Sequence, residues 1–179
     1  MAAPLLYATR GQVSAIAPFA LEGKTSTVVE IEYRGVKSPG VRILVSPAVP
    51  GLLTADASGT GQAAALNQDN SFNSQVGGLP GEYVIVFGVG GPKTDQAGRD
   101  GELYVAPLPK FTGRVVVLLD GVEVPAADVA YVGPAPGLAQ GVWQANIRLP
   151  AGARRNSKME IQLRFGDYVT QPGVVVSVR

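Results

Sequence analysis

The sequence predicts an all-β protein made of two tandem β-sandwiches, the first of which lacks one or two N-terminal strands. Three observations support this prediction. Short apolar runs rich in valine recur every ~8–12 residues, with turn residues between them. The 179 residues include 23 glycines and 14 prolines, which leaves little room for long helices. Finally, one sequence pattern occurs twice along the chain.

Eight apolar runs have the length and the residue types of β-strands. Two of them, Val28–Tyr33 and Val41–Val45, alternate apolar and polar residues, which is typical of a strand with one buried face. The others are rich in β-branched and aromatic residues, which favour strands. In chain order these are Tyr83–Phe87, Val115–Leu119, Val129–Val132, Trp143–Leu149, Met159–Phe165 and Val174–Val178. The dipeptide Asp120-Gly121 predicts a hairpin turn because both residues tolerate positive φ angles.

The repeated pattern relates an N-terminal copy to a C-terminal copy about 132 residues later. The matched segments are Gln12–Pro18 with Gln144–Pro150, Glu30–Tyr33 with Gln162–Phe165, and Ser38–Val41 with Gln171–Val174. The repeat therefore predicts a first sandwich within residues 1–79 and a second within residues 80–179. The expected core residues are Val13, Ala15, Ile31 and Tyr33 in the first copy, and Ala145, Ile147, Leu163 and Phe165 in the second.

The two copies differ at their beginnings. The first has only about ten residues before its Gln12 strand, which predicts an unpaired sheet edge. We expect that the sequence was cut from a longer chain with upstream domains; the alternative is that another segment supplies the pairing. We also expect the hairpin Gly61–Phe72, between the copies, to pack on the first sandwich of a monomer. Exchange of a strand between neighbouring chains is the alternative.

Composition excludes several classes of function. The chain has neither cysteine nor histidine, which excludes disulfides, thiolate nucleophiles, Ser-His-Asp triads and nearly every zinc, haem or iron–sulfur site. A net charge of +1 argues against nucleic acid or an anionic membrane as a partner. No apolar run approaches the ~20 residues that span a bilayer. The segment Met1–Leu6 has neither the basic nor the apolar region of a secretory signal.

Several sequence blocks, distributed over essentially the whole chain, carry a resemblance to known proteins. They are Gln12–Pro18, Glu32–Ser38, Leu66–Asp69, Ala135–Leu138, Trp143–Gly152 and Gln171–Val174. With these blocks the chain resembles the uncharacterised C-terminal domain family of large secreted Acidobacteria (Solibacter-type) proteins. The segment Pro80–Gly90 also resembles the opening of immunoglobulin-like (Ig-like) IPT/TIG domains. The resemblance implies tandem Ig-like sandwiches at the C-terminus of an exported chain, located outside the cell or on its surface. It implies no catalytic residues.

A polar strip on one strand is a candidate ligand-binding site. Gln144, Asn146 and Arg148 share one face of the Trp143–Leu149 strand, whereas Trp143 and the apolar residues share the other. With Tyr131 nearby, this strip would suit a glycan. The alternative is an ordinary solvated face, with Trp143 packed in the core.

Oxygen-bearing side chains at close spacing form a candidate calcium site. Asn67, Asp69 and Asn70 have the residue types of a calcium loop, although the order of ligands in an EF-hand is not matched. Asn and Asp also favour turns, so a plain turn is the alternative. A second candidate cluster of carboxylates lies in a glycine-rich loop, at Asp95, Asp100 and Glu102. We expect no other cofactor.

Three functions are consistent with these patterns. The first is a non-catalytic structural or interaction module that spaces, anchors or presents upstream domains of an exported surface or secreted protein. The second is a carbohydrate-binding module of a secreted enzyme or adhesin, with a cell-surface glycan or another protein as partner. The third is a self-assembling subunit that uses strand complementation. An enzyme is not expected, because without histidine a general base would need a strongly shifted carboxylate or lysine.

Overall fold

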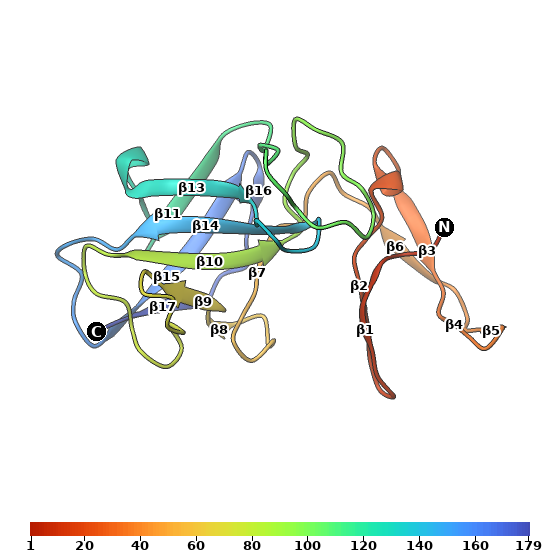
Figure 1. Cartoon of the computed structure of the whole chain (residues 1–179), viewed down its shortest axis with the longest axis horizontal. Coiled ribbons are helices and arrows are strands. Elements are labelled where there is room, and N and C mark those ends of the chain that lie inside the picture. The colour runs from red at the N-terminus through yellow and green to blue at the C-terminus, as the bar shows by residue number, and fades with distance from the viewer. The chain divides into compact units, whose positions relative to one another are not determined.

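The computed structural model describes residues 1–179 and confirms an all-β chain with two short 3₁₀ helices. The chain divides into two compact units, residues 1–47 and residues 48–179 (Figure 1). No helix of the structure has the length and apolar character needed to cross a membrane.

The second unit is a β-sandwich of two sheets. The five-stranded sheet has the order β13-β14-β10-β7, and β9 pairs with β10 as well. Its strands are β13 (Val129–Pro134), β14 (Val142–Arg148), β10 (Tyr83–Val89), β7 (Gly51–Leu52) and β9 (Ala65–Asn67). The centre of this sheet is the antiparallel ladder between β10 and β14, which runs from Tyr83 opposite Arg148 to Val89 opposite Val142 (Figure 1).

The other sheet of the second unit has the order β12-β11-β15-β17-β8, and β16 pairs with β15. Its strands are β12 (Val122–Glu123), β11 (Val115–Leu119), β15 (Ser157–Phe165), β17 (Val174–Val178), β8 (Gly61–Gln62) and β16 (Tyr168–Val169). The hairpin predicted at Asp120-Gly121 joins β11 to β12, and both turn residues have positive φ. The 3₁₀ helix η2 (Ala126–Asp128) then leads into β13.

The core of the second unit lies between these two sheets. Along β10, β14 and β17, and in β15 from Ile161 to Phe165, every second residue is buried, which is the pattern expected when one face of a strand packs against another sheet. The predicted core residues of the second copy are confirmed: Ala145, Ile147 and Leu163 are fully buried and Phe165 is nearly so.

Trp143 anchors one end of this core. Its ring is buried and lies against Gly88 of the neighbouring strand, where a Cβ atom would overlap the indole. The indole Nε1 donates a hydrogen bond to the carbonyl of Val89 at 2.9 Å. The ring also packs edge-on against Phe165, with 5.4 Å between the ring centroids. The core position expected for Trp143 is therefore confirmed, and the glycine beside it is required by its ring.

Residues 48–79 belong to the second unit, so the boundary lies at 47/48 rather than at the expected 79/80. The reason is backbone pairing. Strands β7 and β9 both pair antiparallel with β10, and β8 pairs parallel with β17. The expected hairpin does form around residues 61–72, where Leu66 bridges Phe72, but its strands join the second unit and not the first. The expectation that it packs on the first sandwich was wrong.

Two side-chain amides fix residues 48–79 to the C-terminal strand region. Asn73, 1% exposed, donates to the carbonyl of Ser177 at 2.9 Å and accepts from the Ser177 amide at 2.7 Å. Gln171 reaches Leu52 in the same two-fold way, donating to its carbonyl at 2.7 Å and accepting from its amide at 2.9 Å. Each amide side chain therefore binds both the N–H and the C=O of one distant residue, as a residue of a neighbouring strand does in a β-ladder.

The first unit consists of three separate two-stranded sheets, β1-β2, β3-β6 and β4-β5. The elements are β1 (Leu5–Ala8), β2 (Val13–Ala15), the 3₁₀ helix η1 (Phe19–Leu21), β3 (Ser26–Val29), β4 (Glu32–Tyr33), β5 (Val36–Lys37) and β6 (Val41–Leu44). The expected core residues Val13, Ala15, Ile31 and Tyr33 are all exposed. That prediction was wrong, because alternation identifies an apolar face but not whether another layer covers it. Two tandem sandwiches are accordingly not confirmed.

We predict that Ile147→Ala lowers the free energy of unfolding by about 2–4 kcal/mol, because it removes buried methylenes and leaves a cavity. Ile31→Ala is the matched control. Its side chain is 52% exposed, so the loss should stay below about 1 kcal/mol. Urea unfolding followed by the fluorescence of Trp143, which lies in the second unit, measures the effect of each variant on that unit. Equal losses for the two variants would contradict the assignment of the core to the second unit.

Candidate functional site

The predicted polar strip lies on the outer face of the five-stranded sheet. Gln144 and Asn146 are half-buried and Arg148 is exposed, and all three point away from the core that Trp143 faces. Strand pairing places them beside the outward-facing residues of β10. Phe87 lies opposite Gln144, Ile85 opposite Asn146 and Tyr83 opposite Arg148. On the other side, Tyr131 of β13 lies opposite Asn146. The structure thus brings all four predicted residues together on one face.

The polar groups of this strip bind one another. The Gln144 amide donates to the Asn146 side-chain oxygen at 3.0 Å. The Arg148 guanidinium lies over the Tyr83 ring, 5.0 Å from its centroid, and its Nε is 3.9 Å from the Asp128 carboxylate. Both contacts of Arg148 are at the exposed margin of the sheet, where an ion pair contributes little stability. The ring of Tyr83 is therefore covered on one side.

Tyr131 is held by the backbone of its own strand. Its hydroxyl donates to the carbonyl of Pro134 at 2.7 Å, and its ring lies over Gly133, where a Cβ atom would be 2.6 Å from the hydroxyl oxygen. Burial raises the pKa of the Tyr131 hydroxyl above its usual value, and Tyr104 nearby raises it further. The hydroxyl therefore stays protonated at neutral pH and keeps its hydrogen bond. A ligand would have to displace this bond to use the hydroxyl.

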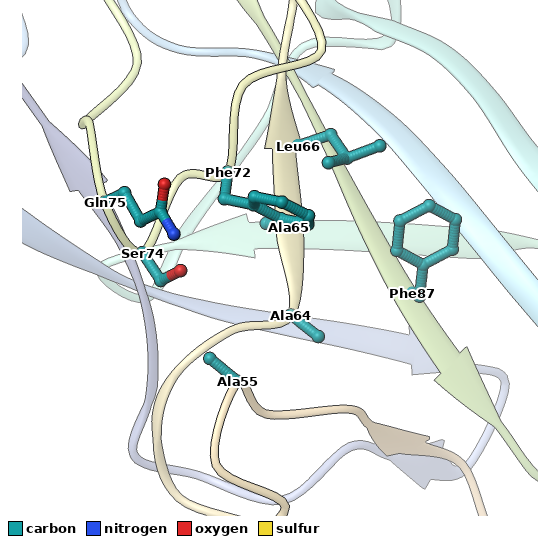
Figure 2. Close-up of a pocket in the computed structure, with 8 residues that line it drawn as sticks. All are labelled: Ala55, Ala64, Ala65, Leu66, Phe72, Ser74, Gln75 and Phe87. Atoms are coloured by element: carbon teal, nitrogen blue, oxygen red, sulfur yellow. The ribbon is translucent and has the colours of Figure 1, made fainter.

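An apolar hollow of about 430 Å³ adjoins the strip, and we call it the β9–β10 hollow. Figure 2 shows Leu66 and Phe87 projecting beside it from neighbouring strands, with Phe72 across from Phe87. Its remaining lining residues are Ala55, Ala64, Ala65, Ser74 and Gln75. Sequence reasoning missed it, because seven of its eight lining residues lie in residues 1–79, which were assigned to the first sandwich. The signal present in the sequence was the outward position of Phe87 on the β10 strand.

The outer face can make apolar contacts and hydrogen bonds. Aromatic and aliphatic side chains supply contact area, and the amides of Gln144 and Asn146 supply donors and acceptors. The resolved pKa shifts are a rise at two tyrosines and a fall at the exposed turn residues Asp56 and Asp69.

The candidate calcium residues Asn67, Asp69 and Asn70 form a hydrogen-bonded turn. The Asn67 side-chain oxygen accepts from the Asn73 amide at 2.8 Å, which leaves it within the buried amide network. Asp69 accepts from the Ser71 hydroxyl at 2.6 Å and from the Ser71 amide at 3.0 Å, and these bonds lower the pKa of its carboxyl. Asn70 has a φ of 65°, as a turn requires. These contacts give each of the three residues a role in the fold.

The second candidate cluster is dispersed along its loop. Asp95 accepts from the Lys110 amide at 2.8 Å, and Glu102 lies 3.7 Å from Arg99. No three acidic side chains of the chain lie close enough together to hold a metal ion. The carboxylates of Asp95, Asp100 and Glu102 therefore do not converge as a set of oxygen ligands.

Comparison with protein-family models, with curated proteins and with solved structures finds no match to this chain.

We predict that calcium leaves the melting temperature of the chain unchanged, because the Asn67 and Asp69 oxygens already accept hydrogen bonds. Differential scanning fluorimetry with millimolar CaCl₂, and again with a chelator, measures this. Asp69→Asn should likewise show no response to calcium. A melting temperature that rises with calcium concentration as ligand linkage requires, and that Asp69→Asn abolishes, would contradict the turn assignment.

Proposed function

We propose that this chain is a non-catalytic structural module that transmits mechanical load in an exported bacterial surface or secreted protein. The resemblance to C-terminal domains of secreted proteins supports the location, and the lack of histidine and cysteine supports the absence of catalysis. The observation that carries the proposal is the way in which the first and last parts of the second unit are joined.

Strand β8, near the beginning of the second unit, and strand β17, at its end, are paired in parallel. Gly61 and Gln62 of β8 lie beside Val174 and Val175 of β17, and Gly78 bridges Val178 further along. Backbone hydrogen bonds from Gly61 to Gly173 (2.7 Å) and from Ala63 to Val175 (2.8 Å) form this ladder. When the two ends of the unit are pulled apart, parallel neighbours slide along each other. Their hydrogen bonds are then loaded in shear together and not one after another.

The two side-chain amides add to the same connection. Asn73 holds Ser177, and Gln171 holds Leu52 and also donates to the Gly59 carbonyl at 3.1 Å. Gln62 joins them, since it donates to Asn73 at 2.8 Å and accepts from the Ser177 hydroxyl at 2.7 Å. Because Asn73 is buried, its partners would be left without hydrogen bonds if it were removed, which is more costly than losing an exposed bond. These side-chain hydrogen bonds and the β8–β17 ladder together form the connection that would bear the force, which we call the load path.

Carbohydrate binding is the second candidate function, and the β9–β10 hollow beside the polar strip is the observation that favours it. A sugar ring could stack on Phe87 while its hydroxyls bind the Gln144 and Asn146 amides. Affinity electrophoresis in gels containing soluble polysaccharides tests this. Retardation that Phe87→Ala removes would support carbohydrate binding over a purely mechanical role.

We predict that Asn73→Ala raises the rate at which the second unit unfolds under constant force by roughly tenfold or more, since about 2 kcal/mol of hydrogen bonding is lost from the load path. Single-molecule extension of the full chain, tethered at its two ends, measures this. The second unit should extend in one step with a contour length of roughly 470 Å.

Asn146→Ala is the matched control, because it removes an asparagine from the same unit outside the load path; its rate should stay within about threefold of the unmodified chain. If the second unit extended gradually at low force, or if the two variants behaved alike, the mechanical proposal would be wrong.

A further inference from the structure

The first unit repeats the backbone pairing of the C-terminal half of the second. Tyr7 pairs with Ser14, as Tyr131 pairs with Asn146, and both ladders have the same irregularity before the tyrosine. In the next hairpin Tyr33 pairs with Val36, as Phe165 pairs with Tyr168. The pairing of β3 with β6 likewise follows that of β15 with β17, with Thr27 opposite Ile43 and Met159 opposite Val176.

Local hydrogen bonds outside the ladders are repeated as well. The Ile31 amide donates to the Ser38 hydroxyl at 3.0 Å, and the Leu163 amide donates to the Thr170 hydroxyl at the same distance. The Ser38 and Thr170 amides return the bond to the Ile31 and Leu163 carbonyls, each at 2.9 Å. Residues 1–47 therefore have the local structure of one half of a sandwich, namely the half formed in the second unit by β13 to β17.

The first unit exposes the side chains that its counterpart buries. Ile31 is 52% exposed and Tyr33 69%, whereas their counterparts Leu163 and Phe165 are 0% and 4% exposed. Ile31, Tyr33 and Val36 line an open groove of about 550 Å³. An exposed apolar face of this kind marks an interaction site.

The second unit shows what covers this face. Strand β10 pairs with β14 over seven residues, and β11 pairs with β15 from Val115 opposite Phe165 to Leu119 opposite Ile161. In the first unit β2 pairs with β1 alone, and β4 pairs with β5 alone. The edges that β10 and β11 would occupy are therefore unpaired in the first unit.

We propose that residues 1–47 are the acceptor half of a sandwich, completed by a protein segment that carries strands equivalent to β10 and β11. Such a segment has apolar residues at alternate positions, as Val84 and Val86 do on β10 and Val117 and Leu119 do on β11. It pairs antiparallel with β2 and with residues 29–33, and its apolar side chains cover Ile31 and Tyr33. Main-chain pairing supplies affinity, and the alternate side chains supply specificity.

Two other occupants fit this face less well. Residues 48–128 of a second copy are already paired with residues 129–179 of their own chain, at the high effective concentration of an intramolecular contact. Two first units facing each other would each bring the same half, and neither would supply a strand of the β10 type. This inference does not depend on the proposed mechanical role.

The test is a fusion that places a copy of residues 48–128 directly before Leu5, because in the second unit Asp128 is followed by Val129, the counterpart of Leu5. Hydrogen–deuterium exchange read by mass spectrometry reports on the amides of residues 26–44. We expect their exchange to slow by about 100-fold or more relative to the unmodified chain, as for amides of a completed sandwich. A shorter fusion, with residues 79–128 only, should also slow the exchange of these amides. It provides a second test in case the longer fusion misfolds.

The matched control carries Val84→Asp and Val86→Asp in the added copy, and it should leave residues 26–44 exchanging as in the unmodified chain. The proposal is overturned if neither fusion slows exchange, or if the control slows it equally. It is also overturned if the unmodified chain already protects these amides while light scattering shows a dimer, since a second copy is then the occupant.

Discussion

The buried amide of Asn73 is the contact on which the architecture of the second unit depends. It holds the backbone of Ser177 on β17, it donates to Asn67 at the end of β9, and it accepts from Gln62 on β8. Residues 48–79 contribute strands of only two or three residues, which have too little backbone pairing to stay docked by themselves. Side-chain hydrogen bonds from Asn73 and Gln171 supply the missing connections, and every buried side-chain nitrogen and oxygen in the chain has a partner. Leu52, Ala63 and Ala65 of this segment are part of the core between the two sheets.

The strands of the second unit could be predicted because each carries its own signal. Alternation along β10, β14 and β15 shows which side chains face the core, and Asp120-Gly121 marks its turn in the local sequence. The position of residues 48–79 could not be predicted in this way, since its short strands have no periodicity and their partners are far away in the chain. The exposure of Ile31 and Tyr33 was missed for a related reason. A pattern describes one face of a strand, and burial depends on what lies opposite.

The same limit applies to the candidate site. Alternation placed Gln144, Asn146 and Arg148 together on one face, and the strand before them added Tyr131. The β9–β10 hollow needs Phe72 and Leu66, which reach Phe87 through the docking of residues 48–79. Asn67 and Asp69 are of residue types that occur in both calcium loops and turns. Their hydrogen bonds give them structural roles, and these bonds cannot be predicted from the spacing of the residues in the sequence.

We infer that residues 48–79 form one cooperative unit with β10 and β17, separate from residues 1–47. Native-state hydrogen exchange of the full chain, followed residue by residue at increasing low concentrations of denaturant, tests it most directly. We expect the amides of Asn67, Asn73 and Gly78 to exchange through the same opening as those of Val86 and Val176, while the amides of β3 and β4 exchange through another. Exchange of residues 48–79 together with residues 1–47, independent of β10 and β17, would contradict it.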